Sequence, residues 1–349
     1  MTTTTTYPGV YIEETASTAI SISSGATAVP IFALYNKFSS ATKVNSWLDY
    51  LKKKGSDFDS NYAGDLSLRI YFENGGGPCY VVNENNLAKE IPKYPDITLI
   101  VSAGLSIYSA AESLCTEGSG LFAIFDGSQT EITSSYDPSD TYTANPYTAV
   151  YYPWLTASWA AKPVPISAAM AGIYCFTDKT RGVWKAPANV AIQGGVKPQF
   201  KMTDDLQGQF NQGLAINMIR TFDNRGPIVW GARTFDDSDS WRYISVRRLF
   251  NSAERDIASA MRSMIFEPNN QPTWEKVRSA VTNYLHSLWR QGALVGTTEN
   301  DAYFVAIGEG VTMTSDDIAQ GKMIIKVGMA AVRPAEFIIL QFTQDVAEN

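Results

Sequence analysis

The hydrophobic pattern between about residues 26 and 180 alternates between two kinds of segment. Short apolar runs typical of buried strands lie at residues 97–101, 121–125 and 148–152. A stretch compatible with a helix lies between the first two runs, at residues 106–115, and another helix is expected after the third, at residues 163–176. Runs that are apolar on both sides predict strands covered by helices on both faces, so we expect an α/β unit with a mostly parallel sheet.

The pattern changes after Trp184. Residues 227–235 and 241–246 have strand character and precede the clearest amphipathic helix, in which apolar residues recur at spacings of three and four from Val246 to Ile265. A second helix is expected to begin at an N-cap on Thr273 and to stop at Gly292. Strands return at residues 302–307 and 322–327. This order predicts an α+β unit.

Both ends of the chain carry an isolated segment with strand character. Residues 7–13 form an apolar island in a start rich in Thr, Ser and Ala, and residues 336–344 are apolar on both faces. Neither segment has a partner strand nearby in sequence, so each must join a sheet elsewhere, in the same subunit or in another. We therefore divide the 349 residues into an N-terminal arm (1–20), an α/β domain (21–185), an α+β domain (186–332) and a C-terminal arm (333–349).

Composition narrows the class of protein. Hydrophobic residues make up 45% and charged residues 18%, which is enough apolar surface for substantial cores without a metal or disulfide framework. The net charge of -7 argues against a nucleic-acid partner, because such binding relies on clustered Lys and Arg. No secretory signal is visible, and the apolar stretch at 163–176 is too short and interrupted to cross a bilayer. We expect synthesis as a soluble cytosolic protein, without membrane insertion.

Residues for catalysis are scarce. The single histidine, His286, lies in a predicted amphipathic helix and cannot build a common zinc site. The glycine run at residues 75–77 lacks the Lys-Ser/Thr of a phosphate loop, and Pro78 leads into a strand where a helix would be needed. The cysteines, Cys79, Cys115 and Cys175, are far apart and are interpreted as reduced core residues. No catalytic, cofactor-binding or metal-binding residue is therefore assigned.

Arginines gather in and before the best helix. In a chain of negative net charge we expect them to pair with carboxylates of the same or adjoining subunits, because Arg makes bidentate contacts with carboxylates. The residues assigned as interface charges are Arg242, Arg247, Arg248 and Arg255.

Several segments together resemble contractile tail sheath proteins. They are YPGVYIEE at residues 7–14, RGVWKAPAN at 181–189, GLAINMIR at 213–220, VWGART at 229–234, WRYISVRRLF at 241–250, FEPN at 266–269 and AAVRPAEF at 330–337. They occur in the family's order and cover both ends and nearly all of the second half. The modest length is most similar to sheaths of extracellular injection particles of the virulence-cassette and anti-feeding-prophage kinds.

The resemblance implies a structural protein and not an enzyme. Sheath subunits stack as hexameric rings in a helical array around an inner tube, between a baseplate and terminator or cap proteins. The sheath is built in a metastable extended state and contracts without a nucleotide to drive the tube through a target envelope. The subunit would thus end up in a released extracellular particle. Whether other sheath paralogues join it stays open.

The resemblance also assigns roles to residues. In the family, both arms cross to neighbouring subunits and complete a sheet there. The intersubunit strand of the N-terminal arm would comprise Tyr7, Pro8, Gly9, Val10, Tyr11, Ile12 and Glu13, and that of the C-terminal arm Phe337, Ile338, Ile339, Leu340, Gln341 and Phe342. The resemblance makes residues 21–185 the outer domain and residues 186–332 the inner domain. The inner domain would face the tube, with Asp316, Asp317 and Lys322 on that surface.

Two other classes of function compete with this interpretation. An α/β hydrolase-like or nucleotide-binding enzyme would need a nucleophile elbow or a phosphate loop, and the sequence contains neither. A carbohydrate- or receptor-binding surface protein could use the 18 tyrosines and 8 tryptophans. These aromatic residues are spread through both predicted domains, which favours core and interface positions.

Overall fold

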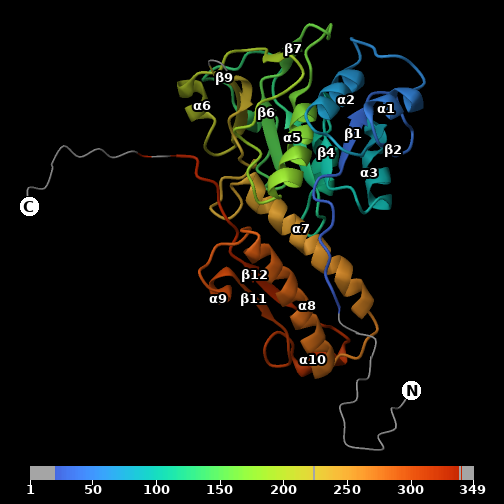
Figure 1. The fold of residues 1–349 in the computed structure, drawn as a ribbon, viewed down its shortest axis with the longest axis vertical. Coiled ribbons are helices and arrows are strands. Elements are labelled where there is room, and N and C mark those ends of the chain that lie inside the picture. The colour runs from blue at the N-terminus through green and yellow to red at the C-terminus, as the bar shows by residue number, and fades with distance from the viewer. Residues whose placement is uncertain (1–19, 223–224, 338, 340–349) are drawn as a thin grey trace, which may run out of the picture.

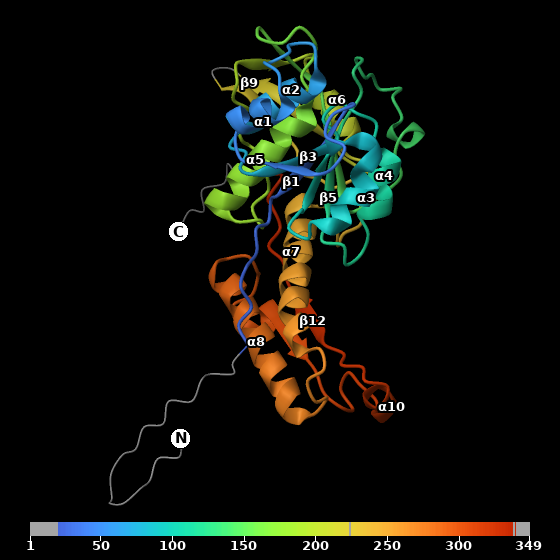
Figure 2. The same cartoon turned by 90° about the vertical axis from the view of Figure 1, so that its right-hand side faces the viewer.

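A computed structural model describes residues 20–222, 225–337 and 339, and it contains two bodies stacked along the long axis (Figure 1). The sheet body consists of β1–β10 with α1–α6. The helical body consists of α8–α10, β11, β12 and the C-terminal part of α7. Helix α7 (Ile244–Met261) runs from one body into the other, as the turned view shows (Figure 2).

An eight-stranded sheet forms the centre of the sheet body, in the order β10-β9-β6-β5-β4-β1-β3-β2. The six inner strands are parallel to one another, and only the edge strands β2 and β10 pair antiparallel. The strands are β1 (Pro30–Leu34), β2 (Thr42–Val44), β3 (Cys79–Asn83), β4 (Leu99–Val101), β5 (Phe122–Asp126), β6 (Thr148–Tyr152), β9 (Ile216–Phe222) and β10 (Gly226–Val229). A small antiparallel pair, β7 (Leu155–Ala157) with β8 (Val196–Pro198), lies beside it. The predicted, mostly parallel sheet is confirmed.

Both faces of this sheet are buried because successive side chains of a strand point to opposite faces. On β1, Phe32 and Leu34 join the core under one layer of helices, while Ile31 and Ala33 join the core on the other face. The first layer contains α1 (Trp47–Lys54), α2 (Ala63–Glu73) and α5 (Ile166–Arg181). The second contains α3 (Leu87–Glu90), α4 (Tyr108–Leu114) and α6 (Asp204–Gln209). This double cover explains the two-sided apolar runs in the sequence.

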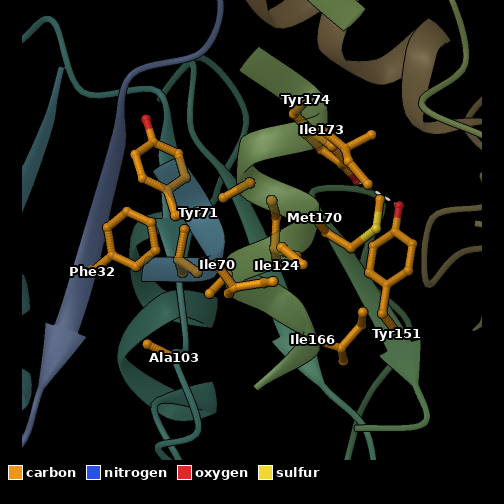
Figure 3. Close-up of a cluster of buried hydrophobic side chains, with 14 of the residues drawn as sticks. Phe32, Ile70, Tyr71, Ala103, Ile124, Tyr151, Ile166, Met170, Ile173 and Tyr174 are labelled. Atoms are coloured by element: carbon orange, nitrogen blue, oxygen red, sulfur yellow. Dashed lines mark hydrogen bonds between the residues drawn. The ribbon is translucent and has the colours of Figure 1, made fainter. Parts of the chain in front are cut away.

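Tyrosines fill much of the core between the sheet and the first layer of helices (Figure 3). The hydroxyl groups of Tyr151 and Tyr174 are 2.9 Å apart and satisfy each other by a hydrogen bond. The Tyr71 ring meets Phe32 edge to face, with ring centroids 4.9 Å apart. Large aromatic side chains in such contacts make a rigid and strongly stabilised centre.

The helical body has its own core. Helices α7 and α8 (Gln271–Arg290) pack with a two-stranded antiparallel sheet, β11 (Tyr303–Ala306) and β12 (Lys326–Met329). Leu249 of α7, Val277 and Leu285 of α8, and Tyr303 of β11 meet in this core. Two short helices, α9 (Glu299–Ala302) and α10 (Ser315–Ala319), complete the body.

The helix starts differ from two sequence predictions. The strand expected at residues 241–246 is wrong: α7 begins at Ile244, after a single bridge between Arg233 and Tyr243. The apolar residues of this segment continue the spacing of three and four that runs through α7. This helical pattern outweighs the strand propensity of a short run. The N-cap of α8 is Asn270, not Thr273, and its side chain accepts from the Thr273 amide. Pro272 in the first turn favours this earlier start.

The chain passes from the sheet body to the helical body later than the domain boundary that we drew near residue 185. Strands β8, β9 and β10 all follow that point and belong to the sheet body. Strand β9 has Met218 in the core of one sheet face and Ile219 in the core of the other, so it needs helix cover on both sides. By packing, the division lies between Phe235 and the middle of α7.

Candidate assembly site

The sheet of the helical body has two open edges. The Ala330 amide donates to the Ala302 carbonyl (2.8 Å), and the register continues through the pairs Phe304–Gly328 and Ala306–Lys326. Because antiparallel strands alternate inward and outward backbone groups, Val305 and Val327 point their amides away from the ladder. In the part of the chain that the structure describes, neither strand has a second strand neighbour.

The surroundings of these edges are partly apolar and accessible. The Phe304 side chain is 59% exposed and lies over Gly328, where an added Cβ would meet the ring. A two-stranded ladder is marginal by itself in water. The edges therefore have the properties of a site that receives additional strands.

The N-terminal segment is fastened along α7. The Gly25 amide donates to Asp256 Oδ1 (3.1 Å), and the guanidinium of Arg255 donates to the Ala26 carbonyl. The Tyr284 hydroxyl donates to the other oxygen of Asp256 (2.9 Å), so both carboxylate oxygens are engaged. Burial lowers the pKa of Arg255, although Asp256 partly offsets this effect. These bonds fix the direction in which the segment leaves the body.

A buried ion pair lies at the next step of this segment. Arg248 of α7 donates to both carboxylate oxygens of Asp178 on α5, at 3.0 and 2.7 Å. Arg248 also donates to the Thr27 carbonyl (3.1 Å), and Thr27 Oγ1 donates to Asp178 (2.5 Å). Burial lowers the pKa of Arg248, but the contacts with Asp178 outweigh it and the pKa is raised. The pair joins α7, α5 and the N-terminal segment.

The C-terminal segment is held by a second charged contact. Arg233 donates to both oxygens of Glu336, with Nε at 3.1 Å from each and Nη2 at 2.6 Å from Oε2. The Tyr243 hydroxyl lies 3.4 Å from the same carboxylate. Immediately beyond, Phe337 and Ile339 are 71% and 80% exposed and belong to no strand of this chain.

The structure leaves the predicted arm strands untested. The expected strand from Tyr7 to Glu13, and Ile338, Leu340, Gln341 and Phe342 of the other arm, lie outside the described residues. Each arm is therefore located only where it joins the body. Sequence reasoning missed the two fastening contacts, although Arg233 and Glu336 both lie in segments that carry the family resemblance.

The predicted interface arginines find partners in their own chain. Arg247 donates to Glu254 (2.8 Å), and its guanidinium stacks 4.0 Å from the Trp241 ring. Arg242 is on the surface and donates to Asp237 (2.8 Å). Arg247 and Arg248 are thus buried within the subunit, while a contact of Arg242 or Arg255 with another subunit stays a prediction.

The predicted tube-facing residues surround the start of α10. Asp317 accepts from the Thr314 amide (3.0 Å) and hydroxyl (2.8 Å) in a capping box. These two hydrogen bonds hold the pKa of Asp317 below its usual range. Lys322 lies 3.7 Å from Asp317, and Asp316 is exposed in the first turn. Asp317 therefore has a structural task, whereas Asp316 is available for a partner.

The carboxyl end of the parallel sheet is where an α/β enzyme would bind its ligand. Asp126 lies there at the end of β5, and it accepts from Ser102 Oγ (2.6 Å), Gly104 N (2.8 Å), and Ser167 N and Oγ (both 2.7 Å). These four donors occupy both oxygens and attach the start of α5 to the sheet. The carboxylate is a structural junction.

Other potential chemical groups have equally structural surroundings. His286 Nδ1 lies 3.0 Å from Glu299 at the surface, and residues 75–77 form a turn before β3. Burial raises the pKa of the Cys79 and Cys115 thiols. Across residues 20–222 and 225–337, no group of three or more His, Cys, Asp or Glu could hold a metal ion. None of the described helices is long and apolar enough to span a membrane.

Comparison with known proteins gives matches over part and over all of the chain. Residues 236–345 match the model of the phage tail sheath C-terminal domain. A putative prophage major tail sheath protein of Pseudomonas aeruginosa (strain UCBPP-PA14) is 24% identical over 186 residues, which are 52% of this chain and 46% of that protein. The chain thus spans about half the length of this curated relative.

Solved structures match over nearly the full length. One is the baseplate of the anti-feeding prophage in its contracted state, with 50% identity over 98% of this chain and 100% of the other, and a TM-score of 0.88. Another is the sheath complex of an extracellular contractile injection system, PVC, in its contracted state, with a TM-score of 0.92. Because identity to that sheath chain is 58% over 99% of both chains, the protein belongs to the contractile tail sheath family.

Proposed function

We propose that this chain is the repeating structural subunit of a contractile sheath of the extracellular injection type. Subunits polymerise helically around an inner tube, and the polymer shortens to drive the tube through a target envelope. The observation that supports the proposal is a small sheet, β11 with β12, that has no third strand among the described residues, in a chain whose two terminal segments have strand character in the sequence. Each arm of one subunit supplies a strand to the sheet of a neighbour.

The strength of such a link follows from its backbone geometry. Strands β11 and β12 each present a four-residue edge. A net gain of roughly 0.5–1.5 kcal/mol per hydrogen bond gives a few kcal/mol per added strand. Burial of apolar side chains such as Phe337 against Phe304 would add to this. The link depends on main-chain pairing, so it tolerates sliding and rotation of the bodies.

Contraction needs no catalytic residue in this scheme. Assembly traps subunits in a higher-energy packing, and release exchanges it for one with better contacts. A gain of only a few kcal/mol per subunit becomes large when a cooperative lattice adds it up. Partners are further copies of the chain, the tube protein, and the proteins that begin and end the tube. The subunit is made in the cytoplasm, and the particle acts after release.

Removal of the N-terminal arm tests the proposal. Deletion of residues 1–14 should leave a folded, monodisperse subunit with an unchanged melting temperature that forms no long tubes in negative-stain electron microscopy. A matched control deletes only the threonine run at residues 2–6 and should still assemble. Normal contractile sheaths from the longer deletion would refute strand donation by this arm.

A second test concerns the tube-facing surface. Asp316 is exposed and Asp317 caps α10, so Asp316→Lys changes the surface charge and leaves the capping box in place. It should loosen the sheath from the tube, giving empty sheaths after mild salt treatment. Asp205→Lys, in the first turn of α6 on the sheet body, is the matched control and should leave tube retention unchanged. Equal tube retention in the two variants would argue against this surface.

A further inference from the structure

Both linking arms leave the body from contacts on or directly beside helix α7. We propose that α7 is the strut that carries tension between the two arms, and that the contact between Arg233 and Glu336 positions the C-terminal arm on it. This inference rests on the proposed function, because it presumes that neighbouring subunits pull on the arms. It adds a role for residues that the family resemblance does not assign.

The C-terminal attachment is built into the start of α7. Arg233 lies opposite Tyr243, the residue before the helix, and backbone bonds flank it: the Thr234 amide donates to the Arg242 carbonyl (2.8 Å) and the Ile244 amide to the Ala232 carbonyl (3.1 Å). A pull on Glu336 is therefore transmitted through the Arg233 side chain and the backbone bridge between Arg233 and Tyr243 to the first turn of α7.

The side chain of Asn217 on β9 holds Arg233 in place. Its Oδ1 accepts from the Arg233 amide (2.8 Å), and its Nδ2 donates to the Arg233 carbonyl (2.8 Å) and to the Val150 carbonyl (3.1 Å). Asn217 is buried, so the amide has no competing water. The backbone of Arg233 is thus fixed before its guanidinium engages the C-terminal segment.

The N-terminal attachment lies further along the same helix. Arg248, Arg255 and Asp256 of α7 bind the chain at Thr27, Ala26 and Gly25 in that order. The N-terminal segment therefore runs antiparallel to α7, and each contact is made by a charged side chain. From Tyr243 to Asp256 the helix spans about 20 Å, at about 1.5 Å per residue.

Packing makes α7 suited to this task. Ile244 belongs to the core of the sheet body, whereas Leu249 and Ala253 belong to the core of the helical body. Force between the two attachments passes along the helix and does not have to pass through the ladders of either sheet. The β11–β12 ladder is spared in particular.

Without the contact at Glu336, tension on Phe337 would act on the residues just before it. The amides of Val332 and Ala330 donate to the carbonyls of Ala293 (3.0 Å) and Ala302 (2.8 Å), respectively. Strand β12 lies directly before these residues in the chain, so it would be pulled next. Pulling from one end would open these bonds one after another, in the manner of a zipper. The arm would then dismantle the same small sheet that receives a neighbour's strand.

Hydrogen exchange on the isolated subunit tests the attachment itself. Glu336→Gln removes the charge and keeps the shape, and Glu267→Gln, at an exposed position after α7, is the matched control. We expect the amides of Ala330 and Val332 to exchange about 10- to 100-fold faster in Glu336→Gln and unchanged in the control, as loss of a charged hydrogen bond implies. An unchanged rate, or an equal rise at buried amides of β5, would overturn the positioning role.

Pulling on a single full-length subunit by its two ends tests the path of tension. The wild type and Glu267→Gln should resist until the bodies unfold, whereas Glu336→Gln should show an earlier extension at lower force as β12 separates. Coinciding traces would overturn the inference. This measurement does not require assembly, so it stands whether or not the chain forms tubes.

Assembled sheaths separate the two proposals. If the wild type forms tubes and Glu336→Gln tubes break into short pieces on contraction, the strut is supported. If Glu336→Gln sheaths contract as unbroken cylinders, the strut fails while the sheath function stands. If the wild type itself forms no tubes, the sheath function fails, and the single-subunit measurements still decide on the attachment.

Discussion

The two bodies treat the edges of their sheets in opposite ways. In the sheet body, the outer side of β10 is covered by backbone bonds with residues 189–192, and the other edge strand, β2, is only three residues long. In the helical body, neither β11 nor β12 has a second strand neighbour within the described residues. Protected edges prevent unwanted pairing, and open edges invite it. The sheet body thus protects its edges, and in the proposed assembly the helical body uses its edges to connect subunits.

Blocking the outward edge of β12 tests whether this edge receives a strand from another subunit. Val327→Pro removes an outward amide of β12 without removing a bond of the β11–β12 ladder, as proline is tolerated at sheet edges. We expect a folded subunit and a loss of tubes in electron microscopy. Val327→Thr keeps the amide and should assemble, and tubes of normal length from Val327→Pro would show that this edge receives no strand.

Exchanging one aromatic residue in each body separates stability from assembly. Phe32→Ala, at a fully buried position, should lower the free energy of unfolding by about 3–5 kcal/mol. Phe304→Ala should change it by about 0.5 kcal/mol or less, because the ring is mostly exposed, yet it should slow tube growth. Urea unfolding and light scattering measure the two effects. Equal destabilisation would remove the contrast between the bodies.

The joint between the bodies can be tested by comparing two arginines. Arg248→Met leaves Asp178 buried without its partner and should cost about 3–5 kcal/mol in the free energy of unfolding. Arg242→Met breaks a surface pair with Asp237 and should cost about 1 kcal/mol or less. Thermal and urea unfolding provide both values. Similar losses would mean that Arg248 does not fasten α7 to α5.

The smallest expected effect is a local dependence on pH at α10. Because the pKa of folded Asp317 is lowered from the usual 3.8, its contribution is complete above that value and is lost as the pH falls through the folded pKa. The Thr314 amide resonance should therefore titrate with a midpoint below 3.8 in NMR spectra. The signal should be flat in Asp317→Asn. A midpoint at or above 3.8 would contradict the capping geometry.

The sequence alone predicted what local patterning controls. Strand β6 was placed at the residues where it lies, because a two-sided apolar run leaves few alternatives. The sequence did not predict that β9 belongs to the large sheet. Its place there depends on pairing with the parallel strand β6, which lies far away in sequence. Family resemblance predicted the arms, but no spacing rule could pair Arg233 with Glu336 across 103 positions. Long-range charge pairs of this kind need the fold before they can be seen.

The uncovered edges of β11 and β12 also bear on the life of the free subunit. Before it joins a particle, each molecule displays two short strands without a further strand neighbour among the described residues, and an extended peptide could pair with them. Lys326 on β12 is a charged residue of the kind that discourages misaligned stacking. Growth of the sheath thus competes with aggregation through the same edges, and this competition becomes more severe as the concentration of free subunits rises.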